Sequence, residues 1–275
     1  MMAALNALLT RLVDSFLRPF EEASPLAGLA VVSFISAIGM LLVIRVTSDQ
    51  ARVAAVKRQL QACVFEIRLF NDDARAILRA LGEMLRHNLT YMRLSAVPVL
   101  WMTVPLGLLL AQLHSHYGYD GLAVGHQAVV KARLRSAPNA LSPQARLAAP
   151  PGIRIETPPV WIPSVREVAW RVAAEQPGDY VLQVQIGEDA FTKSILVSDA
   201  IVRRSPLRTD ERLLNQLIHP GEPPLPVGAE VESIAVTYPR RVVRVLGREI
   251  HWMVVFFALS IIFALALRWR LKIVL

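Results

Sequence analysis

The residues with the clearest chemical potential in this sequence are polar side chains within or beside long uncharged segments. Serine and threonine in such segments commonly bond to their own helix backbone or to a neighbouring helix. A second interpretation is that they line a shallow hydrophilic groove, whose mouth would attract acidic or polar parts of another chain through an arginine. Both interpretations stay open on the sequence alone. The candidate groove residues are Arg45, Ser33, Ser36, Thr103, Gln112 and Ser260.

The other residues that could do chemistry form no catalytic or metal-binding pattern. The six histidines are scattered, and the one close pair, His114 and His116, is two residues apart, a spacing that does not share a helical face. The sequence contains no GxSxG, HExxH, Walker or GxGxxG motif. Asp72 and Asp73 are better explained as helix caps than as a catalytic pair. We therefore expect no enzyme, no catalytic residue, no metal and no cofactor.

The net charge of +8 allows three kinds of partner: nucleic acid, acidic lipid, or the cytoplasmic face of a membrane. Nucleic-acid binding calls for exposed aromatic side chains among the basic ones. Here Phe65, Phe70 and Tyr91 lie in or beside a predicted helical seam. We therefore expect the lipid bilayer as a partner and no nucleic acid as a primary ligand.

Three segments have the length and composition of membrane spans, at residues 25–46, 94–113 and 250–268, and their uncharged parts are residues 25–44, 94–113 and 252–267. Twenty helical residues cover about 30 Å, the thickness of the hydrocarbon core. The second segment contains Pro98 and Pro105, which bend a membrane helix, and Trp252 and Trp269 bracket the third as interfacial aromatics. Residues 1–20 place leucines on one helical face and polar residues on the other, which predicts an amphipathic helix in the headgroup plane.

Residues 48–92, between the first two spans, predict a helical hairpin. Apolar residues recur there at alternating steps of three and four, the spacing of a coiled-coil seam. Asn71, Asp72 and Asp73 interrupt the pattern and offer caps for the second helix. The predicted seam consists of Val53, Val56, Leu60, Cys63 and Ile67 on the first helix and Leu78, Leu81 and Leu85 on the second, continued by Asn88 and Met92. Cys63 is the only cysteine, which excludes an internal disulfide and favours a packing role.

Residues 121–248 predict an all-β domain. They hold 14 of the 18 prolines, and their apolar residues alternate instead of recurring every three or four. Clear examples are the segments 130–134, 168–172 and 180–186. Short strands with frequent turns indicate an antiparallel sandwich, immunoglobulin-like in class, with a helix near residues 209–218. The fold class is therefore a three-span membrane α-helical protein with an external β-sandwich-like domain.

The short basic segments set the expected orientation. The hairpin and the tail at residues 269–275 are rich in arginine, and three spans place both on one side, which should be the cytoplasm. Long translocated domains escape this charge rule. We expect a multi-pass protein of the bacterial inner membrane, with its N-terminus and β domain outside and its hairpin and C-terminus in the cytoplasm.

This order of segments resembles the Oxa/YidC insertase superfamily, particularly its three-span branch, which includes the third subunit of the ER membrane protein complex and the archaeal YidC-like proteins. The likeness covers residues 1–113 and 250–275. It is carried by LLVIRVTSDQARVAAVKRQLQ at residues 41–61 and LTYMRLSAVPVLWMTVPLGLLLAQL at residues 89–113. Many members of the family have a positive charge within the first span, whereas Arg45 lies at its boundary. The external β domain between the second and third spans is an addition to the three-span core.

The resemblance implies a chaperone-like insertase that eases client helices into the bilayer through a polar intramembrane groove, without nucleotide or covalent chemistry. Its partners would be nascent membrane-protein clients at the groove, ribosomes at the hairpin and envelope proteins at the external domain. The alternative is a membrane-anchored structural or interaction protein that displays the β domain.

The predicted orientation has a direct test in topology reporters. A reporter inserted in the hairpin should be active as a cytoplasmic fusion, and one near Gln183 as an external fusion. Reporters that place both sites on one side would overturn the three-span arrangement.

Overall fold

The computed structural model describes residues 2–21, 24–70, 72–136 and 144–271. It divides into two compact units. The helical unit comprises Leu29–Gly107 and Met253–Leu275, and the β unit comprises Met1–Gly28 and Leu108–Trp252.

Three helices are long and apolar enough to cross a membrane: α2 (Pro25–Thr47), α4 (Ala74–Tyr117) and α6 (Trp252–Leu271). Helices α2 and α4 contain the first two predicted spans in full, whereas α6 begins at Trp252, because Ile250 and His251 belong to the strand Arg248–His251. Helix α4 is one continuous helix of 44 residues, so the second predicted span and the second arm of the hairpin belong to one element. By length and composition these helices are candidate membrane spans.

Within the helical unit, two contacts join α2 and α6. The Ser33 hydroxyl, which is fully buried, donates a hydrogen bond of 3.2 Å to the Phe256 carbonyl of α6. The rings of Phe34 and Phe263 meet edge to face, with centroids 5.4 Å apart. One polar and one aromatic contact therefore connect the two helices.

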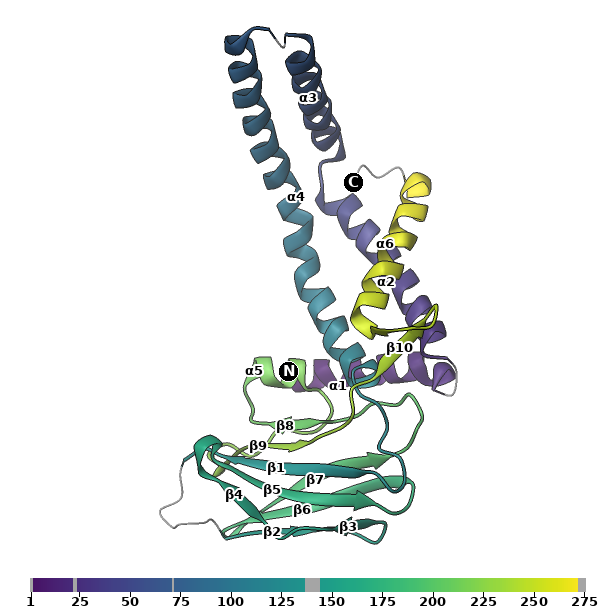
Figure 1. Ribbon diagram of the computed structural model, residues 1–275, viewed down its shortest axis with the longest axis vertical. Coiled ribbons are helices and arrows are strands. Elements are labelled where there is room, and N and C mark those ends of the chain that lie inside the picture. The colour runs from purple at the N-terminus through teal and green to yellow at the C-terminus, as the bar shows by residue number, and fades with distance from the viewer. Residues whose placement is uncertain (1, 22–23, 71, 137–143, 272–275) are drawn as a thin grey trace. The chain divides into compact units, whose positions relative to one another are not determined.

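The hairpin is formed by α3 (Gln50–Leu69) and the first half of α4, which run side by side (Figure 1). Asp49 caps α3 by accepting a hydrogen bond from the Arg52 amide, and Asp73 caps α4 through the amides of Arg75 and Ala76. Asn71, also predicted as a cap, lies outside the described residues. A cation–π contact joins the two helices, with the Lys57 ammonium 5.7 Å from the centre of the Tyr91 ring.

The faces that meet in this hairpin differ from the predicted seam on one of the two helices. On α3, Val53, Val56 and Cys63 are buried as expected, and Leu60 and Ile67 are partly buried. On α4 the buried residue is Ala80, whereas the predicted seam residues are exposed. Their exposed fractions are 70% for Leu78, 46% for Leu81 and 63% for Leu85. Partly buried residues continue the Ala80 face at steps of three and four, namely Ile77, Met84, His87 and Tyr91. Both faces of α4 have heptad spacing, and the one with the smaller residue lies against α3.

The β unit contains two main sheets (Figure 1). The larger has the order β3-β5-β1-β9-β8, with β4 also paired to β5, and the smaller has the order β2-β6-β7. Every pairing is antiparallel. The strands of the larger sheet are β1 (Gln127–Leu134), β3 (Ile153–Ile155), β4 (Val160–Ile162), β5 (Glu167–Ala174), β8 (Leu207–Thr209) and β9 (Val231–Val236). Those of the smaller are β2 (Ala145–Ala148), β6 (Gly178–Ile186) and β7 (Asp189–Val197).

The remaining elements of this unit are short connections and the N-terminal helix. Helix α1 (Met2–Leu17) continues into the 3₁₀ turn η1 (Arg18–Phe20). A second 3₁₀ turn, η2 (Pro163–Val165), precedes β5, and α5 (Leu213–Ile218) follows β8. A separate hairpin of β10 (Val242–Val245) and β11 (Arg248–His251) leads into α6.

One apolar core joins the two main sheets. Its members alternate along the strands as the sequence pattern predicts, with Val130 and Ala132 from β1, Trp170 from β5, and Leu182 and Val184 from β6 all buried. Such a core between two antiparallel sheets is that of a β-sandwich. The coarse fold class, helices with candidate spans plus a β region, is therefore present as predicted.

The buried face of α4 supplies a test of the hairpin. Replacing Ala80 by glutamate places a carboxylate where the side chain has no exposed surface, so we expect the hairpin to open. Leu85→Glu, at a position 63% exposed, should leave the hairpin closed. Limited proteolysis of α3 and the first half of α4 measures this. Equal protease resistance of the two variants would contradict the observed α4 face.

Candidate functional site

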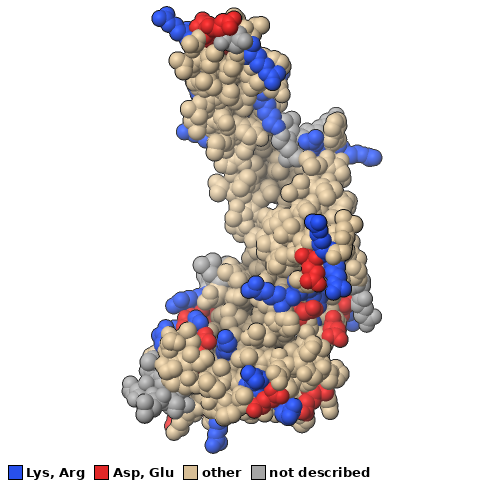
Figure 2. Space-filling view, viewed as in Figure 1, with Lys and Arg blue, Asp and Glu red and all other residues tan. Residues whose placement is uncertain are grey.

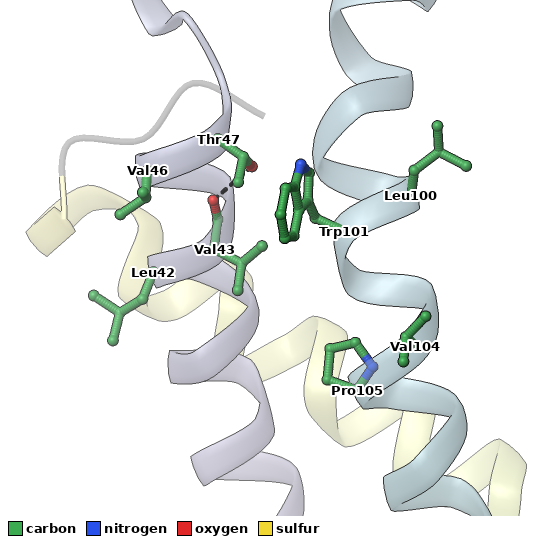
Figure 3. Close-up of a pocket in the computed structure, with 8 residues that line it drawn as sticks. All are labelled: Leu42, Val43, Val46, Thr47, Leu100, Trp101, Val104 and Pro105. Atoms are coloured by element: carbon green, nitrogen blue, oxygen red, sulfur yellow. Dashed lines mark hydrogen bonds between the residues drawn. The ribbon is translucent and has the colours of Figure 1, made fainter.

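An apolar groove lies between α2 and α4. Its volume is about 980 Å³, and it is open along one side. Figure 3 shows the Trp101 indole lying between the two helices, toward Val43 and Thr47. Seven of its eight lining residues are apolar. The lining consists of Leu42, Val43, Val46 and Thr47 from α2 and Leu100, Trp101, Val104 and Pro105 from α4.

The polar groups within the groove are few and mostly satisfied. The Thr47 hydroxyl donates to the Val43 carbonyl at 2.7 Å, which turns it toward its own helix. Pro105 has no N–H, so the carbonyl of Trp101 receives no helical hydrogen bond from the residue four positions later. This carbonyl is a single backbone acceptor in a lining that is otherwise hydrocarbon. The groove therefore suits an apolar occupant.

The groove walls are built from large side chains that are left exposed. Val46 is 84% exposed, Leu100 is 70% exposed, and Trp101 and Val104 are each 67% exposed. In the most apolar 18-residue stretch of α4, only 6% of the residues are buried by the described parts of the chain. In this unit α2 therefore has one face that contacts α6 through Ser33 and another that opens on the groove.

The predicted polar groove residues are distributed over both units and do not line one surface. Ser33 and Ser260 are buried, and Ser33 bonds across to α6. Ser36 is partly buried, and Arg45 is exposed near the end of α2. Thr103 is exposed and donates to the Val99 carbonyl of its own helix at 2.9 Å. The hydroxyls of Ser33 and Thr103 thus follow the helix-bonding interpretation that the sequence left open.

Gln112 lies in the β unit, where it belongs to a buried polar cluster centred on Arg203. The Arg203 guanidinium donates to Gln112 Oε1 at 2.7 Å, to the Ser115 hydroxyl at 2.8 Å and to Asp14 Oδ1 at 2.9 Å. His116 Nε2 lies 3.1 Å from the same carboxylate oxygen. These contacts join α1, the end of α4 and the segment that follows β7. Arg203 was not singled out from the sequence, because its partners lie 88 to 189 positions away.

The carboxylate of Asp14 is ionised at the centre of this cluster. Burial favours its neutral form, but the hydrogen bonds and charges of His116 and Arg203 outweigh burial and lower the pKa of Asp14 below its usual value. Because its side chain keeps 41% of its exposure, solvent weakens each of these attractions. The cluster holds these three segments together, and its electrostatic contribution to the stability of the fold is modest.

A second buried polar cluster lies at the outer edge of β7. The Lys193 ammonium, with no exposed surface, is 2.5 Å from Glu222 Oε1 and donates to the Ser205 carbonyl at 2.6 Å. Burial lowers the pKa of Lys193, while the Glu222 carboxylate acts in the opposite direction. Glu222 also accepts from the Ser194 amide, and the Tyr238 hydroxyl accepts from the Leu196 amide at 3.0 Å. These side chains occupy the edge amides of β7, which protects this edge from pairing with another chain.

No group of three or more His, Cys, Asp and Glu that could hold a metal ion occurs among the residues that the structure describes. The Arg203 and Lys193 clusters thus both lie in the β unit, whereas the groove of the helical unit is apolar.

The Asp14 cluster predicts a pH-dependent stability. Because the pKa of Asp14 is lower in the folded protein, its contribution is complete above the usual carboxyl pKa of about 3.9 and is lost as the pH falls through the lowered value. At pH 7 we expect Asp14→Asn to cost about 1 kcal/mol. The thermal midpoints of the variant and the parent protein in detergent should converge below pH 4. The matched change Asp189→Asn, at an exposed strand end, should have little effect at either pH. A gap that stays constant with pH would contradict the role of Asp14.

Comparisons with protein-family models, with curated proteins and with solved structures found no match to this chain.

Proposed function

We propose that this protein holds apolar helices of client membrane proteins in the groove between α2 and α4, as an insertase or membrane chaperone does. The observation that carries the proposal is the contrast between two faces of α2. One face carries the buried Ser33, which hydrogen-bonds to α6, whereas the open groove face presents the large apolar residues Leu42, Val43 and Val46.

This contrast favours transient binding of varied helices. Fixed interfaces between membrane helices are rich in small residues, because close backbone approach provides most of the attraction when lipid is as apolar as the side chains. A wide groove with an exposed tryptophan lacks that close approach. It offers a client helix loose packing that can adapt to many sequences, and it competes only weakly with lipid, so release is easy.

The proposal differs in one respect from the polar groove expected at first. Polar contacts to the hydrophilic flanks of a client would have to come from outside the groove lining, since that lining contributes only Thr47 and the Trp101 carbonyl. Arg45 is exposed near the end of α2, two residues before Thr47, and is suited to attract an acidic flank.

The cellular setting follows from the distribution of charge. In the bacterial inner membrane, the basic hairpin and C-terminal residues would face the cytoplasm, where nascent clients and ribosomes are. The N-terminal helix and the β unit would face outside and meet envelope proteins. No catalytic step or cofactor is needed for this role.

The second candidate is a membrane-anchored interaction protein that displays the β unit. The Arg203 cluster favours it, because three hydrogen bonds from one guanidinium hold α1, the end of α4 and the segment after β7 together within the β unit. A β unit whose segments are held together in this way suits the presentation of a binding surface. An anchor would have fixed partners, whereas a chaperone would contact chains during synthesis.

Site-specific photocrosslinking separates these two functions. A photoreactive amino acid at Trp101 should capture a nascent membrane protein during its translation, and the same probe at Ile261 of α6 serves as the control, since Ile261 is exposed but not part of the groove. Capture of the same finished proteins at both positions, with no nascent chain, would favour the anchor.

The groove side chains should also determine how much client is held. We expect the double change Val43→Ala and Trp101→Ala to lower client capture at least about fivefold, corresponding to ~1 kcal/mol of lost packing. The matched pair Ile261→Ala and Ile262→Ala, both 58% exposed on α6, should leave capture unchanged. Capture and client insertion in a depletion assay measure this. Equal effects of the two pairs would contradict a specific role of the groove.

A further inference from the structure

The first half of α4 carries an unpartnered leucine stripe beside the face that packs on α3. We define the leucine stripe as Leu78, Leu81, Leu85, Leu89 and Met92. Their exposed fractions are 70%, 46%, 63%, 53% and 61%. Leu78, Leu81 and Leu85 follow one another at steps of three and four residues, and the next step leads to Asn88 or to Leu89. This is the spacing with which one helix packs on another. A helix surface of this kind in water usually has a partner.

An arginine stripe runs along the same part of α4. It consists of Arg79, Arg86 and Arg93, which recur every seven residues and are all exposed. At about 100° of rotation per residue, the α3 face, the leucine stripe and the arginine stripe divide the helix into three sectors roughly 120° apart. Between Ala74 and Arg93 the helix has four arginines and one glutamate, Glu83, a net charge of 4 − 1 = +3. An apolar stripe bordered by positive charge is therefore left open.

The first residues of the leucine stripe lie well before the apolar segment that would enter a membrane. Leu78 is 16 positions before Leu94, where that segment begins, which corresponds to about 24 Å along a continuous helix. Figure 2 shows basic and acidic side chains at the hairpin end of this unit and a largely uncharged surface over the adjoining helical segments. Lipid therefore does not account for the exposure of Leu78 and Leu81, which favours a water-soluble occupant.

We propose that the leucine stripe and the arginine stripe together bind an acidic amphipathic helix of a soluble partner protein. Such a helix would place its apolar residues against the leucines and its carboxylates against Arg79 and Arg86, completing a three-helix bundle with α3 and α4. The occupant is not a second copy of this chain, because a second copy would bring the same four arginines against the first four. The inference depends only on the hairpin lying in water and is independent of what the groove binds.

The full-length protein in neutral detergent micelles tests this with a synthetic probe. The probe is a 21-residue helical peptide with leucine at heptad positions a and d and glutamate at the flanking positions, and its control has lysine in place of every glutamate. Fluorescence anisotropy gives the dissociation constants. We expect the glutamate peptide to bind at least tenfold more tightly than the lysine peptide, with an affinity that falls as salt rises.

Variants of the two stripes localise the binding. The pair Leu81→Glu and Leu85→Glu should weaken binding of the glutamate peptide at least tenfold. The pair Arg79→Glu and Arg86→Glu should do the same and should strengthen binding of the lysine peptide, a gain that a misfolded protein would not show. The control pair is Phe65→Glu and Arg58→Glu, both exposed on the side of α3 away from Cys63, and it should leave binding unchanged.

Three results would overturn the proposal. Equal binding of the two peptides would exclude recognition of acidic charge, and equal loss in the control pair would place binding elsewhere. A disulfide-linked dimer of the Leu85→Cys variant in a Cys63→Ala background, formed at high yield without added peptide, would show that a second copy covers the stripe.

Discussion

The constraint on which the helical unit depends is that a hydrocarbon environment cannot hydrogen-bond exposed backbone groups. Segments that enter it must be helices with few charges, and the described chain meets this with α2, α4 and α6. Since α4 continues without a break from Ala74 to Tyr117, the same helix supplies one wall of the apolar groove and one arm of the basic hairpin. A partner that binds the hairpin therefore contacts the same helix that carries Trp101. Within this helix, Pro98 and Pro105 are the positions at which a bend is permitted.

The β unit meets a different constraint, that a buried charge needs partners. Arg203 and Lys193 each lie at a junction between segments distant in sequence, and each is satisfied by several oxygens. Removal of one member would leave the others uncompensated, which costs more than the pair contributes when intact. These clusters therefore specify which segments meet more than they add to stability. In the same way Glu222 and Tyr238 close the edge of β7, while burial raises the pKa of Tyr238 to about 12 and keeps its hydroxyl neutral as an acceptor.

Local patterns in the sequence predicted the helices and strands. The prediction of which face is buried was wrong on α4, where two patterns compete. Uncharged length located the three spans, and alternation located the buried faces of β1, β5 and β6, because both properties are local. On α4, however, two adjacent faces have the same heptad spacing. Hydrophobicity favours the one with Leu81 and Leu85, whereas close packing on α3 favours the one with Ala80. Which of two such faces is buried depends on the neighbouring helix, and that information is absent from α4 itself. The Arg203 cluster escaped prediction for a similar reason, since its partners lie in α1 and at the end of α4.

The environment of the polar residues in the candidate spans also depends on neighbouring helices. A serine in a membrane helix has two stable environments, a neighbouring helix backbone or water, and sequence alone does not choose between them. Once Ser33 has bonded to α6 and Thr103 to its own helix, the face left between α2 and α4 is one of large hydrocarbon side chains. The free energy of such a face is similar in lipid and against another apolar helix. Its wide opening also prevents the close approach of backbones that would make a helix contact long-lived. The proposed exchange of apolar helices would use this open face, while the buried Ser33 on another face of α2 bonds to α6.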